Sequence, residues 1–306
     1  MRAAGIDLGG TKIETQIFDA DWQPVTRQRV PTPKDYAGLV KAVADQVRWA
    51  EAAAGEGLPI GIGAAGLVNP ATGLALTANL VASGHPFPAD ITAAAGRDVL
   101  YVNDCRALAL SEAVFGAGRG YHTVLGLILG TGIGGGISIG GHLLPGPSMT
   151  GGEFGHTSAP ADLVAKHRLP VVPCGCGAMG CIETLIAGPG LARVALAMTG
   201  QELSPPAIAA AKGGEMAAVW QVWCDLVAAL LRNLTLTVDP DIIVLGGGLS
   251  QIPGVTEDLT TALQSAQLAG FAIPKLAVAQ GGDSSGARGA AYAAWTAQRS
   301  RQKVAS

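Results

Sequence analysis

The sequence has few charged residues and no strong excess of either sign. Of its 306 residues, 20 are Lys or Arg and 23 are Asp or Glu, so the formal net charge is −3 and charged residues make up 14%. A basic surface that would coat a nucleic-acid backbone is therefore not indicated, and 49% hydrophobic residues argue against disorder. Nonspecific nucleic-acid binding is thus excluded as an expected function.

Long apolar runs are also missing. The mean hydropathy is +0.36, yet no run reaches the ~18 apolar residues that a membrane-spanning helix needs. The best candidate, Val124 to Ile139, is interrupted by Thr131 and six glycines. At the N-terminus, Asp7 and the glycines after it stand where a signal peptide requires an apolar stretch. We expect no membrane span and a cytoplasmic location.

Two common nucleotide-binding motifs are absent or misleading. There is no G-x-x-x-x-G-K-[ST] segment, which excludes a P-loop NTPase. Gly130 to Gly135 matches G-x-G-x-x-G, but Ser138, Ile139 and Gly140 continue as strand and turn, where a dinucleotide-binding fold needs a helix. The Rossmann match is therefore rejected.

The pattern of apolar runs and glycines predicts two related α/β lobes. A length of 306 residues fits one large domain or two ordinary ones. The chain opens with a hairpin that consists of a strand, a glycine turn and a returning strand, and this pattern is repeated about 120 residues later. Expected strands are 3–8, 13–17, 59–65, 98–102, 124–129, 137–139 and 241–245; expected helices are 36–54, 105–115, much of 186–236, and 286–298. We predict lobes of residues 1–118 plus 287–306 and of residues 119–286, packed over a cleft.

The two glycine hairpins are candidate phosphate-binding turns. In Asp7-Leu8-Gly9-Gly10-Thr11-Lys12, a carboxylate ends a strand beside a turn whose N–H groups and Thr11 hydroxyl lie open to a phosphate. The segment 130–136 offers a second such turn, and an ordinary Gly-Gly hairpin is the alternative for each. A third glycine segment, Gly246 to Gly248, follows a strand and would let a flat ring approach the backbone.

Asn103 and Asp104 stand between a strand and a helix. A carboxylate at such a strand end is well placed to act as a general base. The alternative is a plain helix N-cap, for which Asn and Asp are both favoured.

Three cysteines within eight residues, Cys174, Cys176 and Cys181, are separated mainly by glycines and predict a metal-binding knuckle. Zn²⁺ takes four such ligands in structural sites, and His156 is the best fourth. The alternative is three unmetallated thiols, because five cysteines in a reducing compartment do not indicate a disulfide framework. A filled site would shape the segment that carries Glu153 and Glu183, which would otherwise be read as solvated surface carboxylates.

Taken in order, these motifs resemble the ROK family of repressors and sugar kinases over nearly the whole chain. The resemblance rests on Asp7 to Lys12, Asn103-Asp104, Leu129 to Gly136, Glu153-Phe154-Gly155-His156, Cys174 to Glu183 and Gly246 to Gly248. It implies a two-lobed, actin-like (ribonuclease H-like) hexokinase fold with ATP and a sugar bound in the cleft, and a homodimer. Val30 to Pro33, Ser83 to Pro86 and Thr150 to His156 resemble the bacterial N-acetyl-D-glucosamine kinases in particular.

The resemblance also implies roles for individual residues. Asp104 would take the proton from the 6-hydroxyl of N-acetyl-D-glucosamine, and His156 would bind zinc through one ring nitrogen while the other faces the sugar. The remaining sugar-side residues are Gly66, Asn79, Asn103, Glu153 and Glu183; the residues implied around ATP and Mg²⁺ are Asp7, Gly9, Gly10, Thr11, Lys12, Gly130, Thr131, Gly132, Gly134, Gly246, Gly247 and Gly248.

Two departures from the family pattern leave the substrate open. Ala65 stands where members usually carry proline, and Cys105-Arg106 follows the predicted base where Ala-Asn is usual. Arg106 would either lower the pKa of Asp104 or point to solvent. Glucose, fructose and N-acetylmannosamine are therefore alternative substrates. A sugar-sensing repressor is a remote alternative, because only six residues precede Asp7, and intact Asp104 argues against a sugar-binding protein without turnover.

Overall fold

The computed structural model describes residues 2–77, 79–144, 146–282 and 285–305, with the side chains of 303–305 left out. It divides into unit 1, residues 1–120, 136–151 and 280–306, and unit 2, residues 121–135 and 152–279. The predicted division put 136–151 and 280–286 in the other lobe. Those segments join unit 1 because residues of α3 (Asp104–Phe115) hold them, as described below. None of the described helices combines the length and apolar character needed to cross a membrane.

Unit 1 is built on a five-stranded mixed sheet in the order β3-β2-β1-β4-β7. β1 pairs antiparallel with β2 and parallel with β4, so the predicted opening hairpin is confirmed. The edge strand β3 was not predicted, because its exposed polar positions hide the strand pattern. The strands are β1 (Ala3–Leu8), β2 (Lys12–Phe18), β3 (Pro24–Pro31), β4 (Ile60–Ala64), β7 (Leu100–Asn103) and the separate pair β5 (Leu67–Val68) and β6 (Ala75–Leu76).

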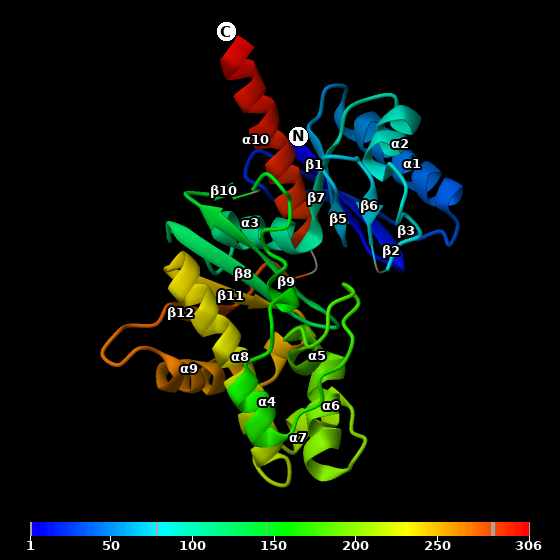
Figure 1. Ribbon diagram of the computed structural model, residues 1–306. Helices are drawn as coiled ribbons and strands as arrows, with labels where there is room; N and C mark the ends of the chain where they lie inside the picture. Colours follow the sequence, from blue (N-terminus) through cyan, green and yellow to red (C-terminus); the bar gives the residue numbers. More distant parts are fainter. Residues whose placement is uncertain (1, 78, 145, 283–284, 306) are drawn as a thin grey trace. The chain divides into compact units, whose positions relative to one another are not determined.

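Helices cover both faces of this sheet (Figure 1). On one face, apolar residues of β1, β2 and β4 form a core with α1 (Tyr36–Ala54) and α2 (Phe87–Ala95). On the other, α10 (Ser285–Ala305) packs against β1, β4 and α3 (Asp104–Phe115). The approach of α10 is close enough to require glycine: a Cβ on Gly5 or Gly61 would lie 1.8 or 1.9 Å from a carbonyl oxygen of α10. The glycine- and alanine-rich sequence of α10 is what permits this packing.

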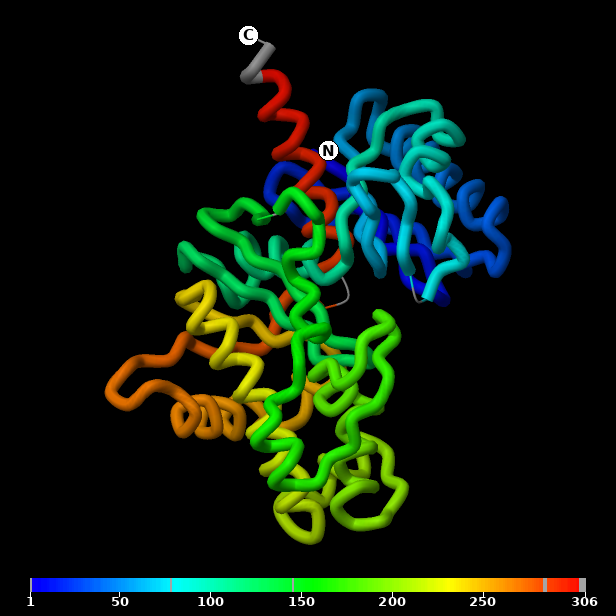
Figure 2. The backbone as a smooth tube through the Cα atoms, viewed as in Figure 1, coloured from blue at the N-terminus to red at the C-terminus, as the bar shows by residue number. Residues whose placement is uncertain are grey.

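The second sheet has the equivalent order, β10-β9-β8-β11-β12, which supports the predicted duplication. Its strands are β8 (Thr123–Leu129), β9 (Ile133–Ile139), β10 (His142–Leu143), β11 (Ile242–Gly246) and β12 (Lys275–Val278). Figure 2 follows the chain of unit 2 from residue 152 through a mainly helical region before it returns to β11. The helices before β11 are η1 (Phe154–His156), α4 (Ala161–His167), α5 (Glu183–Ile186), α6 (Gly188–Thr199), α7 (Pro205–Ala210) and α8 (Ala217–Val238), and those after it are η2 (Gly248–Gln251) and α9 (Val255–Ala266).

The predicted glycine turn 130–136 is wrong at its C-terminal end, because β9 already begins at Ile133. The glycines at 134–136 lie inside a buried strand instead. They are explained by close packing: a Cβ on Gly135 would lie 2.1 Å from the carbonyl oxygen of Gly126, and one on Gly136 would lie 2.9 Å from Cα of Arg106.

Glu112 of α3 is fully buried and fixes the segment that leads into α10. Its carboxylate accepts hydrogen bonds from the N–H groups of Ala117 (3.0 Å), Gln280 (2.9 Å) and Gly281 (2.7 Å) and from the Ser285 hydroxyl (3.0 Å). One side chain thus satisfies donors from three stretches of chain.

Replacing Glu112 by Ala is expected to lower the free energy of unfolding by roughly 3–5 kcal/mol, because buried donors lose their acceptor together. Urea denaturation measures this change. Asp45→Ala is the matched control, since Asp45 is an exposed carboxylate paired with Lys41 and Arg48 and should contribute about 1 kcal/mol or less. Equal losses in the two variants would contradict the role given to Glu112.

Candidate active site

The turn between β1 and β2 is shaped by its neighbours in unit 1. The Thr32 hydroxyl donates to the carbonyl of Gly9 (2.7 Å), and Lys34 Nζ donates to that of Gly10 (2.9 Å). Glycine is required at position 10 because a Cβ there would lie 2.9 Å from the carbonyl oxygen of Asn79. The structure therefore brings two predicted residues, Gly10 and Asn79, together and leaves Thr11 exposed.

Asp7 lies near the end of β1 and is half-buried. It faces the first turn of α10, where a Cβ on Gly286 would lie 3.1 Å from Asp7 Oδ1. Lys12 is the first residue of β2 and is half-buried too. Both ends of the predicted phosphate turn thus lie on strands of the same hairpin.

Asn103 is the N-cap of α3, and Asp104 is the first residue of that helix. Asn103 Oδ1 accepts from the N–H groups of Cys105 (3.0 Å) and Arg106 (3.2 Å), while its Nδ2 donates to the carbonyl of Gly66 (3.0 Å). The N-cap interpretation is therefore correct for Asn103. It leaves Asp104 available for chemistry, because the neighbouring residue does the capping.

Burial raises the pKa of Asp104 above its ordinary value, although the Cys105 N–H at 2.9 Å from Asp104 Oδ1 partly offsets the effect. Tyr101, three residues before Asp104 on β7, also has a raised pKa, through burial and then through the charge of Asp104. A carboxylate in such surroundings is more basic than one in water, which suits a group that must accept a proton.

Arg106 follows neither of the two outcomes expected for it. Its side chain is only 3% exposed, so it does not point to solvent, and the net shift in the pKa of Asp104 is upward. The guanidinium instead donates through Nε to the carbonyl of Gly151 (2.9 Å) and through Nη2 to that of Met149. Arg106 therefore ties the loop before Glu153 to the helix that begins with Asp104.

In unit 2, His156, Cys174, Cys176 and Cys181 converge with their ligand atoms within 4.8 Å of one another. Cys174 Sγ lies 3.5 Å from His156 Nδ1, and Cys176 Sγ lies 3.6 Å from Cys181 Sγ. A tetrahedral Zn²⁺ with Zn–S bonds of about 2.3 Å separates its sulfur ligands by about 3.8 Å. The donor set and its spacing fit a structural zinc ion.

The three thiols of this cluster differ in the direction of their pKa shifts. Burial raises the pKa of Cys181 to about 12 and also raises that of Cys174. The exposed Cys176 instead has a lowered pKa, chiefly because the Ala178 backbone N–H is directed at its sulfur. A divalent cation would displace the remaining thiol protons on binding. The convergence of the four ligand atoms, and not the thiol pKa values, indicates a metal site.

Two glutamates, Glu153 and Glu183, lie beside the cluster formed by His156 and the three cysteines. His156 Nε2, the nitrogen not turned toward Cys174, lies 3.7 Å from Glu153 Oε2. Glu183 Oε2 accepts from the Ile133 N–H (2.8 Å), and Cys174 Sγ donates to Glu183 Oε1 (3.7 Å). Both glutamates are half-buried, so the solvated-surface alternative is wrong for them.

The Gly130–Gly132 turn lies beside the N-terminus of α6. The Gly188 N–H donates to the carbonyl of Gly130 (2.8 Å), and Thr131 and Gly132 are exposed at the turn. The positive end of a 12-residue helix thus adjoins the predicted phosphate turn. Gly134, also predicted to lie near phosphate, is buried within β9.

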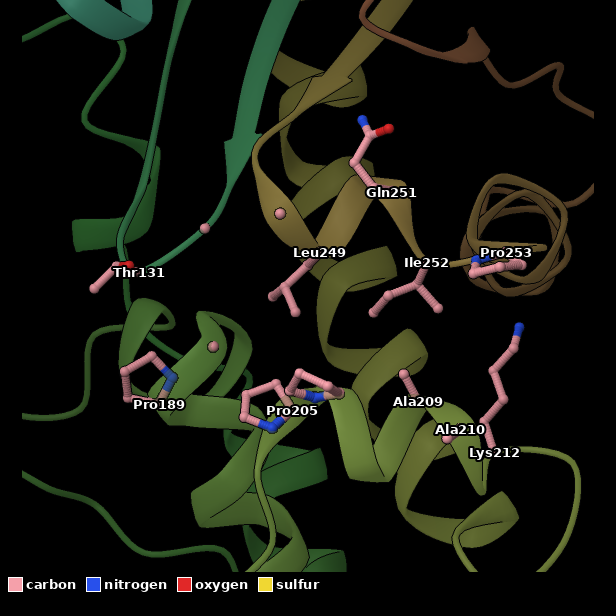
Figure 3. Close-up of a pocket in the computed structure, with 14 residues that line it drawn as sticks. Thr131, Pro189, Pro205, Ala209, Ala210, Lys212, Leu249, Gln251, Ile252 and Pro253 are labelled. Atoms are coloured by element: carbon pink, nitrogen blue, oxygen red, sulfur yellow. The ribbon is translucent and has the colours of Figure 1, made fainter. Parts of the chain in front are cut away.

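A cavity of about 880 Å³ opens next to this turn, wholly within unit 2. Figure 3 shows Leu249 and Ile252 on one side of it and Pro205 and Ala209 on the other, with Thr131 at one end. Of the predicted glycines, Gly130 and Gly248 line the cavity. Gly247 takes a φ of +84°, and a Cβ there would lie 2.4 Å from the carbonyl oxygen of Leu129. Gly246 ends β11.

Sequence reasoning missed most of the cavity walls. They come from α7, from the start of α6 and from the residues around η2, segments far apart in the chain. Proline, alanine, leucine and isoleucine carry no chemical signal in a sequence, and only their placement around one space reveals them. The signal that was available was the glycine loop at 246–248.

The model of the ROK family matches residues 3–297 of the chain. The N-acetylgalactosamine kinase AgaK of Shewanella sp. strain ANA-3 is 40% identical over 292 residues, covering 94% of each chain. The N-acetyl-D-glucosamine kinase of Pectobacterium atrosepticum is 41% identical over 296 residues, covering 94% of this chain and 97% of that protein.

Solved structures with the same fold include a ROK hexokinase from Thermus thermophilus, with a TM-score of 0.86, 32% identity, and coverage of 98% of this chain and 100% of that one. A ROK family glucokinase from Streptomyces griseus, solved with glucose and AMPPNP, has a TM-score of 0.75 and 28% identity, covering 95% and 98% of the two chains. These likenesses confirm the predicted two-lobed, actin-like sugar-kinase fold.

Proposed function

The chain belongs to the ROK family, and from that membership we propose that this ATP-dependent sugar kinase phosphorylates the 6-hydroxyl of N-acetyl-D-glucosamine, giving N-acetylglucosamine 6-phosphate and ADP. The observation that carries the proposal is the Asp104 carboxyl, placed at the start of α3 with a raised pKa. The kinases named for N-acetylated hexosamines, at about 40% identity, support the choice of acceptor.

In the proposed reaction Asp104 accepts the proton of the 6-hydroxyl while the oxygen of that hydroxyl bonds to the γ-phosphorus of ATP. The bond from this phosphorus to the ADP oxygen breaks in the same step. Phosphoryl transfer requires positioning and charge neutralisation more than covalent chemistry. Asn103, Gly66 and Asn79 are assigned to the sugar side. The hydrogen bond from Asn103 to Gly66 supports a shared role in holding that side in place.

Glu153, His156 and Glu183 are proposed to bind the other sugar hydroxyls. The convergence of His156 with the three cysteines supports this role, because zinc bound at Nδ1 would fix the tautomer and orientation of the ring, whose Nε2 lies beside Glu153. Zinc, held by His156, Cys174, Cys176 and Cys181, would supply shape and no catalysis, since all four positions of its coordination are protein ligands.

For ATP, we assign the phosphates to the glycine turns, namely Gly9, Gly10, Thr11 and Lys12 of the first turn and Gly130, Thr131 and Gly132 of the second. The Gly246–Gly248 loop is assigned to the base, which the cavity beside Gly248 supports. Asp7 is assigned to Mg²⁺, whose chemistry there would be to neutralise the charge that develops on the phosphates. A homodimer stays a prediction.

N-acetyl-D-galactosamine is a second candidate acceptor. The specific observation in its favour is AgaK, which is 40% identical over 94% of the chain. The two sugars differ only in the configuration at C4, so the residues that contact the 4-hydroxyl decide between them.

The test is the rate of sugar-phosphate formation with Mg-ATP across N-acetylglucosamine, N-acetylgalactosamine, N-acetylmannosamine, glucose and fructose, compared as kcat/KM. Highest kcat/KM for N-acetylglucosamine is expected. Preference for another sugar would overturn the acceptor and keep the kinase, whereas no turnover on any of them would overturn the kinase as well.

A further inference from the structure

The cavity of unit 2 is a slot with apolar walls. Leu249 and Ile252 face Pro205 and Ala209 across it, and all four point into the space between (Figure 3). Walls of this kind bind a flat ring by its faces, through burial of apolar area, and this attraction does not depend on which hydrogen-bonding groups the ring carries at its edge.

Few side chains of the lining carry groups that can read the edge of a ring. Among the described residues of the lining, Pro189, Pro205, Pro206 and Pro253 have no N–H to donate. Three lining side chains carry hydrogen-bonding atoms, namely Thr131, Lys212 and Gln251. Whether they recognise a base depends on where they lie and what already holds them.

Each of these three side chains lies at an end of the slot, points away from it, or is held by another residue. Thr131 belongs to the glycine turn at one end of the slot, where the phosphates are assigned. Gln251 points away from Pro205 and Ala209 in Figure 3, and its Nε2 donates to the Ser250 hydroxyl (3.2 Å).

Lys212 closes the opposite end of the slot and is also engaged. Its Nζ lies 2.5 Å from Asp258 Oδ2 and 4.9 Å from the centre of the Trp220 ring. The Trp220 Nε1–H donates to the same carboxylate oxygen at 2.8 Å. An ammonium held this way offers no acceptor, so it cannot select the 6-amino group of adenine, which is a donor.

We infer that the nucleotide site selects a purine by shape and does not discriminate adenine from 6-oxopurines, so that ITP and GTP serve as phosphoryl donors beside ATP. The inference rests on the proposed function, since it takes the slot as the base site of the donor nucleotide. Apolar pockets reject near-isosteric ligands weakly, whereas sites that hydrogen-bond a group reject its absence by factors of about 10⁴. A cavity of about 880 Å³ also leaves room for the 2-amino group of guanine.

The experiment measures kcat/KM for sugar-phosphate formation with ATP, ITP, GTP and CTP at saturating sugar. We expect ITP and GTP to fall within about tenfold of ATP, and CTP to be lower because a single ring buries less apolar area. A kcat/KM for ITP more than about 100-fold below that for ATP would overturn the inference while leaving the kinase intact. No turnover with ATP would instead overturn the proposed function.

A pair of variants ties the result to the slot. Ala209→Leu fills the space between the walls, and Ala207→Leu places the same side chain at an exposed position of the same helix, outside the lining. Ala209→Leu is expected to raise the KM of all three purine nucleotides about tenfold or more, with the sugar KM unchanged, and Ala207→Leu to change neither. Unchanged nucleotide KM values in Ala209→Leu would place the base elsewhere and overturn the inference.

Discussion

Asp104→Asn is expected to lower kcat by about 10²–10⁴-fold, the range by which a positioned general base accelerates a reaction. The substitution keeps the size of the side chain and the acceptor atom that faces the Cys105 N–H, but it removes the site that receives the proton. Asn103, which caps α3, is untouched. Steady-state kinetics with Mg-ATP and N-acetylglucosamine measure the loss.

The control for this prediction is Asp90→Asn, which changes a carboxylate at the start of α2 that accepts a hydrogen bond from the Tyr36 hydroxyl. It should retain kcat. Near-normal turnover in Asp104→Asn, or an equal loss in both variants, would mean that Asp104 is not the base.

Asp104→Asn is also expected to preserve or raise the melting temperature at pH 7. The pKa of Asp104 is higher in the folded than in the unfolded chain, so the ionised carboxylate destabilises the fold. That penalty is absent below the unfolded value of about 3.9 and complete once the pH exceeds the raised folded value. The difference in melting temperature between variant and wild type should therefore shrink as the pH is lowered toward 4. A variant clearly less stable than wild type at pH 7 would contradict this sign.

Metal removal is the second change with a large expected effect. The protein should carry about one zinc per chain, and Cys176→Ser should lower that content to a small fraction, with a sugar KM raised about tenfold or more. Cys176 is exposed, so its replacement disturbs little packing and the effect reports loss of the ligand. Elemental analysis and kinetics on the same preparation measure both quantities.

Cys224→Ala is the matched control, because Cys224 is buried in α8 and is not one of the four converging ligands. It should retain zinc and the sugar KM. An unchanged sugar KM in verified zinc-free Cys176→Ser protein would separate the metal from sugar binding. Zinc retained by that variant would show that the four residues are not the ligand set.

Much of the architecture follows from local patterns. The helix at Tyr36–Ala54 has the predicted ends, and the strands 3–8 and 124–129 were readable because apolar residues run into glycine turns. The convergence of His156 with the three cysteines was also predictable, since closely spaced thiols permit few arrangements other than a knuckle.

Other features depended on contacts between distant residues. Arg106 was left with two expected orientations and took a third, because the carbonyls of Met149 and Gly151 lie where its guanidinium reaches them. The segments 136–151 and 280–286 join unit 1 for a similar reason. Their partners on α3 are not neighbours in the sequence.

The sequence by itself determined the family and the paired hairpins, and it predicted the general base and the four metal ligands, because each depends on residue types at short spacings. Only the tertiary structure decided which glycines form a turn and which lie in β9, and which apolar residues wall the cavity. Close packing and the shape of an apolar space arise from segments far apart in the chain, and neither leaves a local pattern to read.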